Sequence, residues 1–296
     1  MRCQLLQAIR SFFLGEGFLE VQTPVRTPAP APEIHIDAMP ADGTWFLSTS
    51  PELYMKRLLA AGYEKIFQIS PVFRRGELGR LHHPEFTMLE WYRSEADYHD
   101  LQKDCQCLLT ALCRKMERIP GWDYRGRWLQ VTGEWQCYTV REAFLRFAGW
   151  EPGLDVDQSR FDMDLVEKVE PSLGFPQPCI LMDYPANQAA LARLKPASDR
   201  SVAERFELYW AGIELANGFS ELTDAREQRR RFEETIEMRR IAGNPTYPLP
   251  EAFLRSIEHL SPCAGIALGV DRLAMLLADA DHLDGVVAFP PSLNTP

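Results

Sequence analysis

The chain has 296 residues, of which 46% are hydrophobic and 25% are charged, and its formal net charge at pH 7 is −10. This composition suits a folded protein with a sizeable core, whereas the acidic balance disfavours nucleic acid as the main partner, because binding by counterion release needs a basic contact face. The chain has no apolar run of membrane-spanning length and no signal-peptide pattern, so we expect a cytoplasmic protein without membrane association.

The elements of the N-terminal third are predicted from apolar spacing and from the positions of glycine and proline. A first helix is expected from apolar residues that share one face, namely Leu5, Ile9, Phe12 and Phe13. Four prolines make residues 24–33 a loop rather than a helix. Ser50 as N-cap and Pro51 as first residue predict a second helix, which Gly62 ends. Strands are expected at 18–21, 34–39, 44–48, 65–73 and 85–92.

The remaining elements are predicted in the same way. Residues 98–118 form an amphipathic helix, and Thr139 with Glu142 makes a capping box before a short one. Thr223 is expected to cap a long charged helix that ends near Ile241. Two more helices are expected at 251–260 and 271–279, and further strands at 179–183, 205–210, 213–219, 265–269 and 286–289.

Strands joined by hairpins, with helices outside them, predict an α+β domain around a mainly antiparallel sheet. The sequence has no GxGxxG and no GxxxxGK[ST], so a nucleotide would not be held by a Rossmann turn or a P-loop. The seven cysteines show no CxxC spacing, and we expect them to be reduced thiols rather than disulfides or zinc ligands.

The most informative segment is a predicted strand, charged loop and strand at residues 73–92, which reads FRRGELGRLHHPEFTMLEWY. The guanidinium of Arg74, at the end of the first strand, can hold a carboxylate and a phosphate oxygen together. Aligning these two groups is what carboxylate activation by ATP requires. His82, His83 and Phe86 could form a purine pocket, with Phe86 stacking on the base. Taken alone, such a loop could also be a solvated hairpin with structural charges.

A second segment, GIALGVDR from Gly265 to Arg272, is a strand that turns directly into a helix. Small residues allow the backbone to approach a ligand closely, and Arg272 lies in the first helical turn, where N–H groups favour anions. An arginine here can hold the terminal phosphates of ATP and stabilise charge on the leaving pyrophosphate. By itself, this segment could equally be a glycine turn beside a surface arginine.

Carboxylates recur in the segment ERFELYWAGIELANGFSE, at Glu207, Glu214 and Glu221, with Asn217 among them. Two hard oxygen ligands near a triphosphate suggest Mg²⁺ at Glu207 and Glu214. The alternative is a solvated acidic edge of the sheet. The apolar surroundings argue against this alternative, because buried acids need a cation.

A pocket shared by Glu52, Glu90, Tyr92 and Glu221 would select a small molecule with two positive charges. Lysine or an isomer of lysine has this character.

These segments resemble the catalytic domain of the class II aminoacyl-tRNA synthetases over nearly the whole chain, 1–296. FLEVQTP at Phe18–Pro24 is similar to motif 1, residues 73–92 to motif 2 and Gly265–Arg272 to motif 3, while SPELYMKR, MLEWY and NGFSEL resemble the lysyl subgroup. The resemblance implies a six-stranded, mainly antiparallel sheet flanked by helices. It also implies ATP with Mg²⁺, and a homodimer formed through motif 1.

The resemblance also assigns site residues, with Arg74 and Arg272 as the candidate catalytic pair. Residues implied at ATP are Arg74, Arg75, Gly76, Glu77, His82, His83, Phe86, Glu214, Leu215, Gly269 and Arg272. Residues implied at a lysine or β-lysine substrate are Ser50, Pro51, Glu52, Glu90, Tyr92, Asn217, Glu221 and Ala267. The implied metal ligands are Glu207 and Glu214.

Three departures separate the chain from a lysyl-tRNA synthetase. Motif 1 begins almost at Met1, so we expect a single catalytic domain with an insertion at about 96–180 and no anticodon-binding domain. Arg75 and Gly76 stand where the synthetases have Asn-Glu, which makes Glu77, one place later, the candidate for the adenine contact. Ala267 replaces a glycine of motif 3.

The first and third departures resemble the truncated lysyl-tRNA synthetase paralogues that modify translation elongation factor P. In that family (R)-β-lysine is activated as an adenylate and passed to a lysine ε-amino group of the factor, which implies elongation factor P rather than tRNA as the partner. Two alternatives stay open: a free-standing enzyme that charges tRNA with lysine, and a non-catalytic regulatory paralogue. Retention of Arg74 and Arg272 weighs against the second.

Arginine groups could dock an acidic protein partner, although each could also be a solvated face. They are 229–231, 239–240, and Arg125 with Arg127.

Overall fold

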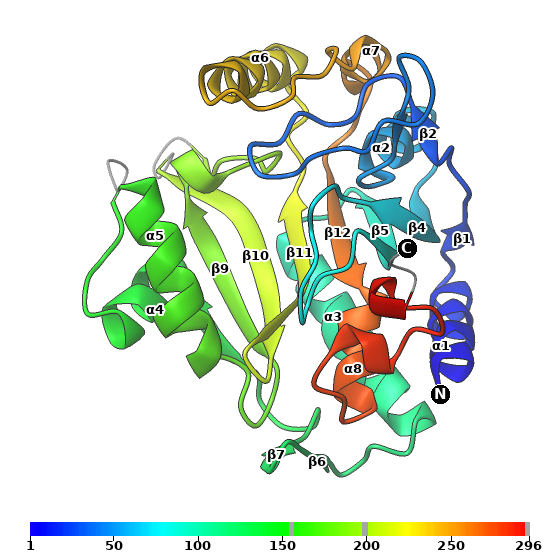
Figure 1. Ribbon diagram of the computed structural model, residues 1–296, viewed down its shortest axis with the longest axis vertical. Helices are drawn as coiled ribbons and strands as arrows, with labels where there is room; N and C mark the ends of the chain where they lie inside the picture. The colour runs from blue at the N-terminus through cyan, green and yellow to red at the C-terminus, as the bar shows by residue number, and fades with distance from the viewer. Residues whose placement is uncertain (154–156, 197–200, 294–296) are drawn as a thin grey trace.

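The computed structural model describes residues 1–153, 157–196 and 201–293. Its centre is a sheet in the order β1-β4-β5-β12-β11-β10-β9-β8 (Figure 1). These strands are Leu19–Glu20, Lys65–Phe73, Glu85–Ser94, Cys263–Gly269, Ile213–Ser220, Val202–Trp210, Cys179–Pro185 and Gln136–Thr139. Neighbours from β4 to β9 run antiparallel, whereas β1 and β8 pair in parallel at the edges. The α+β class with a mainly antiparallel sheet is confirmed; the described sheet adds one parallel strand at each edge of the expected six.

Helices surround this sheet, as Figure 1 shows. They are α1 Arg2–Gly15, α2 Glu52–Ala60, α3 Tyr98–Lys115, α4 Val140–Phe147, α5 Gln158–Asp164, α6 Ala225–Ile241, α7 Glu251–Ile257 and α8 Val270–Leu277. The α3 helix packs against α1, β11 and β12, whereas α4 packs against β8 and β9. Two small ladders are also present, β2 Arg26–Thr27 with β3 Phe46–Leu47 and β6 Trp122–Tyr124 with β7 Arg127–Leu129. None of the described helices has both the length and the apolar character to cross a membrane.

Side-chain alternation gives the sheet two different faces. In β12, the odd and even positions point to opposite sides because successive residues of a strand alternate. Ala264, Ile266 and Leu268 are buried in the core that includes the apolar residues of α1 and α3. Gly265 and Ala267 therefore lie on the other face, where small side chains leave space.

Local capping signals were largely correct. Thr139 and Glu142 form the expected capping box of α4. The helix of 225–241 is also present, but its cap is Asp224 rather than Thr223, because the Asp224 carboxylate accepts from the backbone N–H groups of the first turn. Ser50 lies one residue before the N-cap position of α2, and its hydroxyl accepts from the N–H of Glu52 at 3.0 Å.

The strand expected at 34–39 is wrong, and the reason is a buried arginine. Arg239 is 1% exposed and donates to the carbonyl oxygens of Glu33, Ile34 and Ile36. Carbonyls held by a guanidinium are not available to a strand ladder. Arg239 also pairs with Asp37, so the expectation that it belongs to a docking surface is wrong as well.

The strand expected at 286–289 is wrong too. The chain forms 3₁₀ turns at Leu283–Gly285 and Pro291–Leu293, and residues 286–289 between them form no strand. Of the apolar run that suggested a strand, Val286 packs against the core whereas Phe289 is 82% exposed.

Candidate active site

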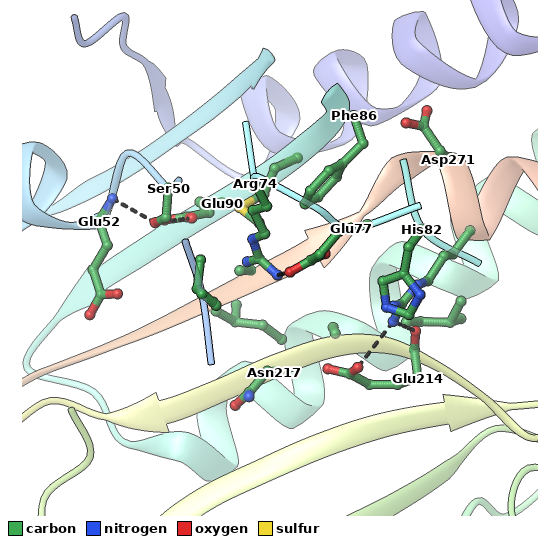
Figure 2. Close-up of a pocket in the computed structure, with 18 of the residues that line it drawn as sticks. Ser50, Glu52, Arg74, Glu77, His82, Phe86, Glu90, Glu214, Asn217 and Asp271 are labelled. Carbon is green, nitrogen blue, oxygen red and sulfur yellow. Dashed lines mark hydrogen bonds and ion pairs between the residues drawn. The ribbon is translucent and has the colours of Figure 1, made fainter. Parts of the chain in front are cut away.

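A cavity of about 210 Å³ opens on the sheet face that carries Gly265 and Ala267. Its walls come from β5, β11 and β12, from the loop after β4 and from the first turn of α8. Figure 2 shows Arg74 beside Phe86 and Glu77 in the middle of this cavity, with Ser50, Glu52 and Glu90 towards one end and His82 and Glu214 towards the other. Segments that are far apart in the sequence therefore meet at one site.

The register between β5 and β12 creates the space. Gly265 lies opposite Tyr92 and Ala267 opposite Glu90. A Cβ on Gly265 would lie 2.1 Å from Cε1 of Tyr92 and 2.5 Å from Oε1 of Glu221. Such distances are far below van der Waals contact, so only glycine allows these two side chains to approach the strand.

A buried carboxyl marks one end of the cavity. Glu90 is 1% exposed and accepts hydrogen bonds from the hydroxyl of Ser50 at 2.6 Å and from that of Tyr92 at 2.9 Å. Burial and, next, the charge of Glu52 raise the pKa of Glu90 to about 8. A bound cation would favour the ionised form, so this end attracts a positive group.

The same end holds a lysine that the sequence reading missed. Lys56 is 2% exposed and forms ion pairs with both Glu52 and Glu221. Although burial opposes the charged ammonium, the carboxylates of Glu221 and Glu52 raise the pKa of Lys56 above its ordinary value. The spacing of Glu52 and Lys56, four residues apart in a helix, was the available signal.

Two buried polar atoms at the site have no hydrogen-bond partner among the described residues. They are Oε1 of Glu221, on the carboxylate that pairs with Lys56, and Nε of Arg74. An unsatisfied buried group costs about 1–3 kcal/mol. Arg74 lines the cavity whereas Glu221 does not, so an anionic oxygen of a ligand in the cavity would satisfy the Arg74 atom directly.

Arg272 lies at the opposite end of the cavity and contacts several residues there. Its guanidinium donates to the carbonyl oxygen of Glu214 at 2.7 Å and pairs with the Glu214 carboxylate at 3.0 Å. It also donates to the carbonyl of Leu81 and contacts Nε2 of His82 at 2.8 Å. Burial, reinforced by the charge of Arg272, lowers the pKa of His82, so a neutral imidazole faces this arginine.

A β-bulge brings Glu214 to the cavity. Tyr209 pairs with Glu214 and Leu208 with Ala216, which leaves Leu215 as an extra residue in β11. An extra residue changes the side to which the following side chains point. Glu214 and Asn217 therefore both line the cavity, although simple alternation would place them on opposite faces.

The structure brings most of the sequence-predicted site residues together. Those that line the cavity are Ser50, Glu52, Arg74, Glu77, His82, His83, Phe86, Glu90, Tyr92, Glu214, Leu215, Asn217, Ala267, Gly269 and Arg272. Those that do not line it are Pro51, Arg75, Gly76, Glu207 and Glu221. Sequence reasoning missed Glu33, whose pKa is raised to about 7 by burial, as well as Met88 and Asp271 on the cavity wall.

The two carboxylates expected to hold Mg²⁺, those of Glu207 and Glu214, have different partners and different positions relative to the cavity. Glu207 pairs with Arg205 at 2.7 Å and accepts from the hydroxyl of Tyr209 at 2.6 Å, away from the cavity wall. Glu214 faces the cavity but is paired with Arg272. As arranged, these two residues do not offer a shared pair of free carboxylates for a divalent ion.

Comparison with known proteins agrees with this geometry. The family model described as "tRNA synthetases class II (D, K and N)" matches residues 1–292. A protein of Pectobacterium carotovorum named elongation factor P–(R)-β-lysine ligase is 43% identical, over 97% of this chain and 93% of its own length. Proteins of the same name from Photobacterium profundum and Vibrio cholerae are 40% and 39% identical, each over 98% of this chain and 94% of their own length.

Proposed function

The chain belongs to the class II tRNA synthetase family and, within it, to the group of elongation factor P–(R)-β-lysine ligases; on this premise we propose that it activates (R)-β-lysine with ATP and attaches it to elongation factor P. The observation that carries the proposal is a single cavity with two arginines, Arg74 and Arg272, and a buried group of carboxylates at one end. Such a cavity suits a triphosphate beside a small diamine acid.

In the first step, a carboxylate oxygen of β-lysine attacks the α-phosphorus of ATP. A new P–O bond forms, the bond to the β-phosphate oxygen breaks, and pyrophosphate leaves. Arg74 aligns the carboxylate with the α-phosphate, Phe86 lies beneath the guanidinium at 5.2 Å and stacks on adenine, and Arg272 stabilises charge on the leaving pyrophosphate. Mg²⁺ would accompany the triphosphate and screen its charge; of the two carboxylates predicted to hold it, only Glu214 lines the cavity.

In the second step, the ε-amino nitrogen of a lysine on elongation factor P attacks the acyl carbonyl carbon of the adenylate. An amide forms, the nitrogen loses a proton and AMP leaves. Glu52 holds the substrate amino group near its carboxylate, while Tyr92 and Glu221 hold the distant ammonium. Tyr92 lines the cavity, and Glu221, although it does not line the cavity, keeps Oε1 without a hydrogen-bond partner among the described residues; these two observations support the assignment.

The proposal is tested by offering both acceptors at once. The protein is incubated with ATP, labelled (R)-β-lysine, elongation factor P and bulk tRNA. Label is expected on the protein acceptor and not on tRNA. Label on tRNA alone would show a tRNA-charging enzyme, and absence of ATP–pyrophosphate exchange with every lysine analogue would show a non-catalytic binder.

Ala267 is expected to set the choice between β-lysine and α-lysine. It lines the cavity opposite Glu90 on β5 and Asn217 on β11. Ala267→Gly adds space where an α-amino group would lie, so kcat/KM for α-lysine relative to β-lysine should rise about 10-fold or more. The ratio is measured by ATP–pyrophosphate exchange with each substrate.

A matched control is Ala264→Gly, which makes the same change in the same strand on the core face. It should lower thermal stability without changing the ratio. An unchanged ratio in Ala267→Gly would refute the selectivity role.

Glu90 predicts how substrate binding depends on pH. Because its pKa is raised to about 8, the ionised carboxylate becomes more abundant as pH rises through 8, and its attraction for the substrate ammonium increases. KM for β-lysine should therefore fall several-fold between about pH 7 and pH 8.5. KM for ATP, measured in parallel, should not follow this curve. A KM for β-lysine that stays flat over this range would contradict the assignment of Glu90.

We also propose a homodimer, a cytoplasmic location and a single catalytic domain with an insertion at about 96–180. Exposed apolar residues in and next to motif 1 support the dimer: Leu19 within it, Leu14 in the preceding helix and Val25 directly after it. A cytoplasmic location follows from a partner that acts in translation. A stable monomer in sedimentation would contradict the dimer.

A further inference from the structure

Three metal-binding side chains meet where the loop after β4 contacts the C-terminal segment. Nε2 of His83 lies 2.8 Å from Oδ1 of Asp284, and Nδ1 of His282 lies 3.2 Å from the same oxygen. One ligand atom from each of the three residues lies within 4.8 Å of the others. Among the described residues, no other group of three His, Cys, Asp or Glu side chains meets this condition.

The donor set has a definite chemical preference. Two imidazole nitrogens and one carboxylate oxygen favour Zn²⁺ and similar transition ions, whereas Mg²⁺ prefers oxygen ligands alone. Around a tetrahedral zinc ion, ligand atoms about 2.05 Å from the metal lie about 3.3 Å apart, close to the observed 2.8 and 3.2 Å. An ion bound to Nδ1 of His282 would replace the hydrogen bond that this atom accepts from the backbone N–H of Asp284 at 3.2 Å.

Outer contacts already hold the ligands in position. The second oxygen of Asp284 accepts from the hydroxyl of Ser292 at 2.6 Å, an arrangement that fixes a ligating carboxylate. His83 is 2% exposed, whereas the side chain of His282 is 42% exposed. One side of the group is therefore rigid and the other is open to an ion from solvent.

The location of the group indicates what an ion would do. The N–H of Leu283 donates to the carbonyl of Arg80, and the Arg80 guanidinium donates to the carbonyl of Asp281, both at 3.1 Å. His83 and Leu283 also line the cavity. An ion between His83 and Asp284 would add a strong cross-link between the same two segments.

We propose that His83, His282 and Asp284 form a site for one divalent transition ion, with Zn²⁺ as the reference ligand. The bound ion links the loop after β4 to the C-terminal segment. The ion is structural and distinct from any Mg²⁺ that accompanies ATP. It stabilises the loop that also bears Arg74, Glu77 and His82 without touching the reacting atoms.

The test measures the metal directly. The full chain, free of added metal, is dialysed against Zn²⁺ in millimolar Mg²⁺, and bound zinc is counted. One equivalent is expected, together with a higher Tm. With Co²⁺ as probe, visible absorption should show a tetrahedral site without a thiolate charge-transfer band, which distinguishes these ligands from the cysteines.

His282→Ala and Asp284→Asn should each weaken zinc binding at least tenfold and abolish the rise in Tm. His259→Ala, at an exposed histidine outside the group, should leave both unchanged. Because these readouts do not use enzyme activity, they are independent of the proposed ligase reaction. Zinc binding that persists in both variants, or that is absent from the unaltered chain, would overturn the proposal.

Discussion

Arg272→Ala is expected to reduce ATP–pyrophosphate exchange by about 100- to 1000-fold, the usual effect of removing one preorganised donor to a developing negative charge. The guanidinium projects from the first turn of α8 and lines one end of the cavity, where it is positioned by contacts with Leu81, Glu214 and His82. Arg272→Lys keeps the charge but loses the planar fork, so its rate should lie between those of the alanine variant and the unaltered chain.

The control is Arg240→Ala on α6, where the arginine side chain is 68% exposed and pairs with Glu237 of the same helix. Its exchange rate should be unchanged. Because Arg272 also supports Glu214 and His82, Tm and circular dichroism must show that the alanine variant remains folded. Near-normal exchange in a folded Arg272→Ala protein would remove the phosphate-binding role.

Lys56→Met is expected to destabilise the fold by about 3–5 kcal/mol, because it leaves the carboxylates of Glu52 and Glu221 buried without their cation. Methionine has nearly the shape of the lysine stem, so the loss reports charge rather than volume. The measurement is the free energy of unfolding from denaturant titration. Lys103→Met, at a side chain that is 72% exposed, is the matched control and should change stability little.

A double variant separates charge from packing. Lys56→Met combined with Glu221→Gln removes both members of the more deeply buried pair, and it should be more stable than Lys56→Met alone, since fewer unpaired charges remain buried. Additive losses in the double variant would show that the pair has no coupling and that Lys56 acts through packing alone.

Lys56 also changes how the acidic end should be understood. The sequence suggested three carboxylates, Glu52, Glu90 and Glu221, around a substrate with two positive charges. The structure adds an internal ammonium between two of them. Part of the negative charge is therefore neutralised before any ligand binds, and Glu90 is the buried carboxyl of this group that lines the cavity.

Local patterns in the sequence predicted the elements well where periodicity and caps agree. The strand at 65–73 and the capping box of Thr139 and Glu142 were predicted as found. The strand at 34–39 was not, because its carbonyls are bound by Arg239 from a helix two hundred residues later in the chain. Periodicity and capping patterns report interactions between residues that are close together in the sequence. The contact from Arg239 joins residues that are far apart in the sequence, so these patterns do not reveal it.

The sequence by itself determined the class of sheet and the family, and it predicted two arginines that line the cavity, because these depend on residue types at short, fixed spacings. Only the tertiary structure decided which candidates share the cavity. A bulge at Leu215 turns Glu214 towards it, while Arg205 and Tyr209 hold Glu207 away. The physical reason is that side-chain direction, burial and ion pairing are set by contacts between distant strands, which spacing along one strand does not specify.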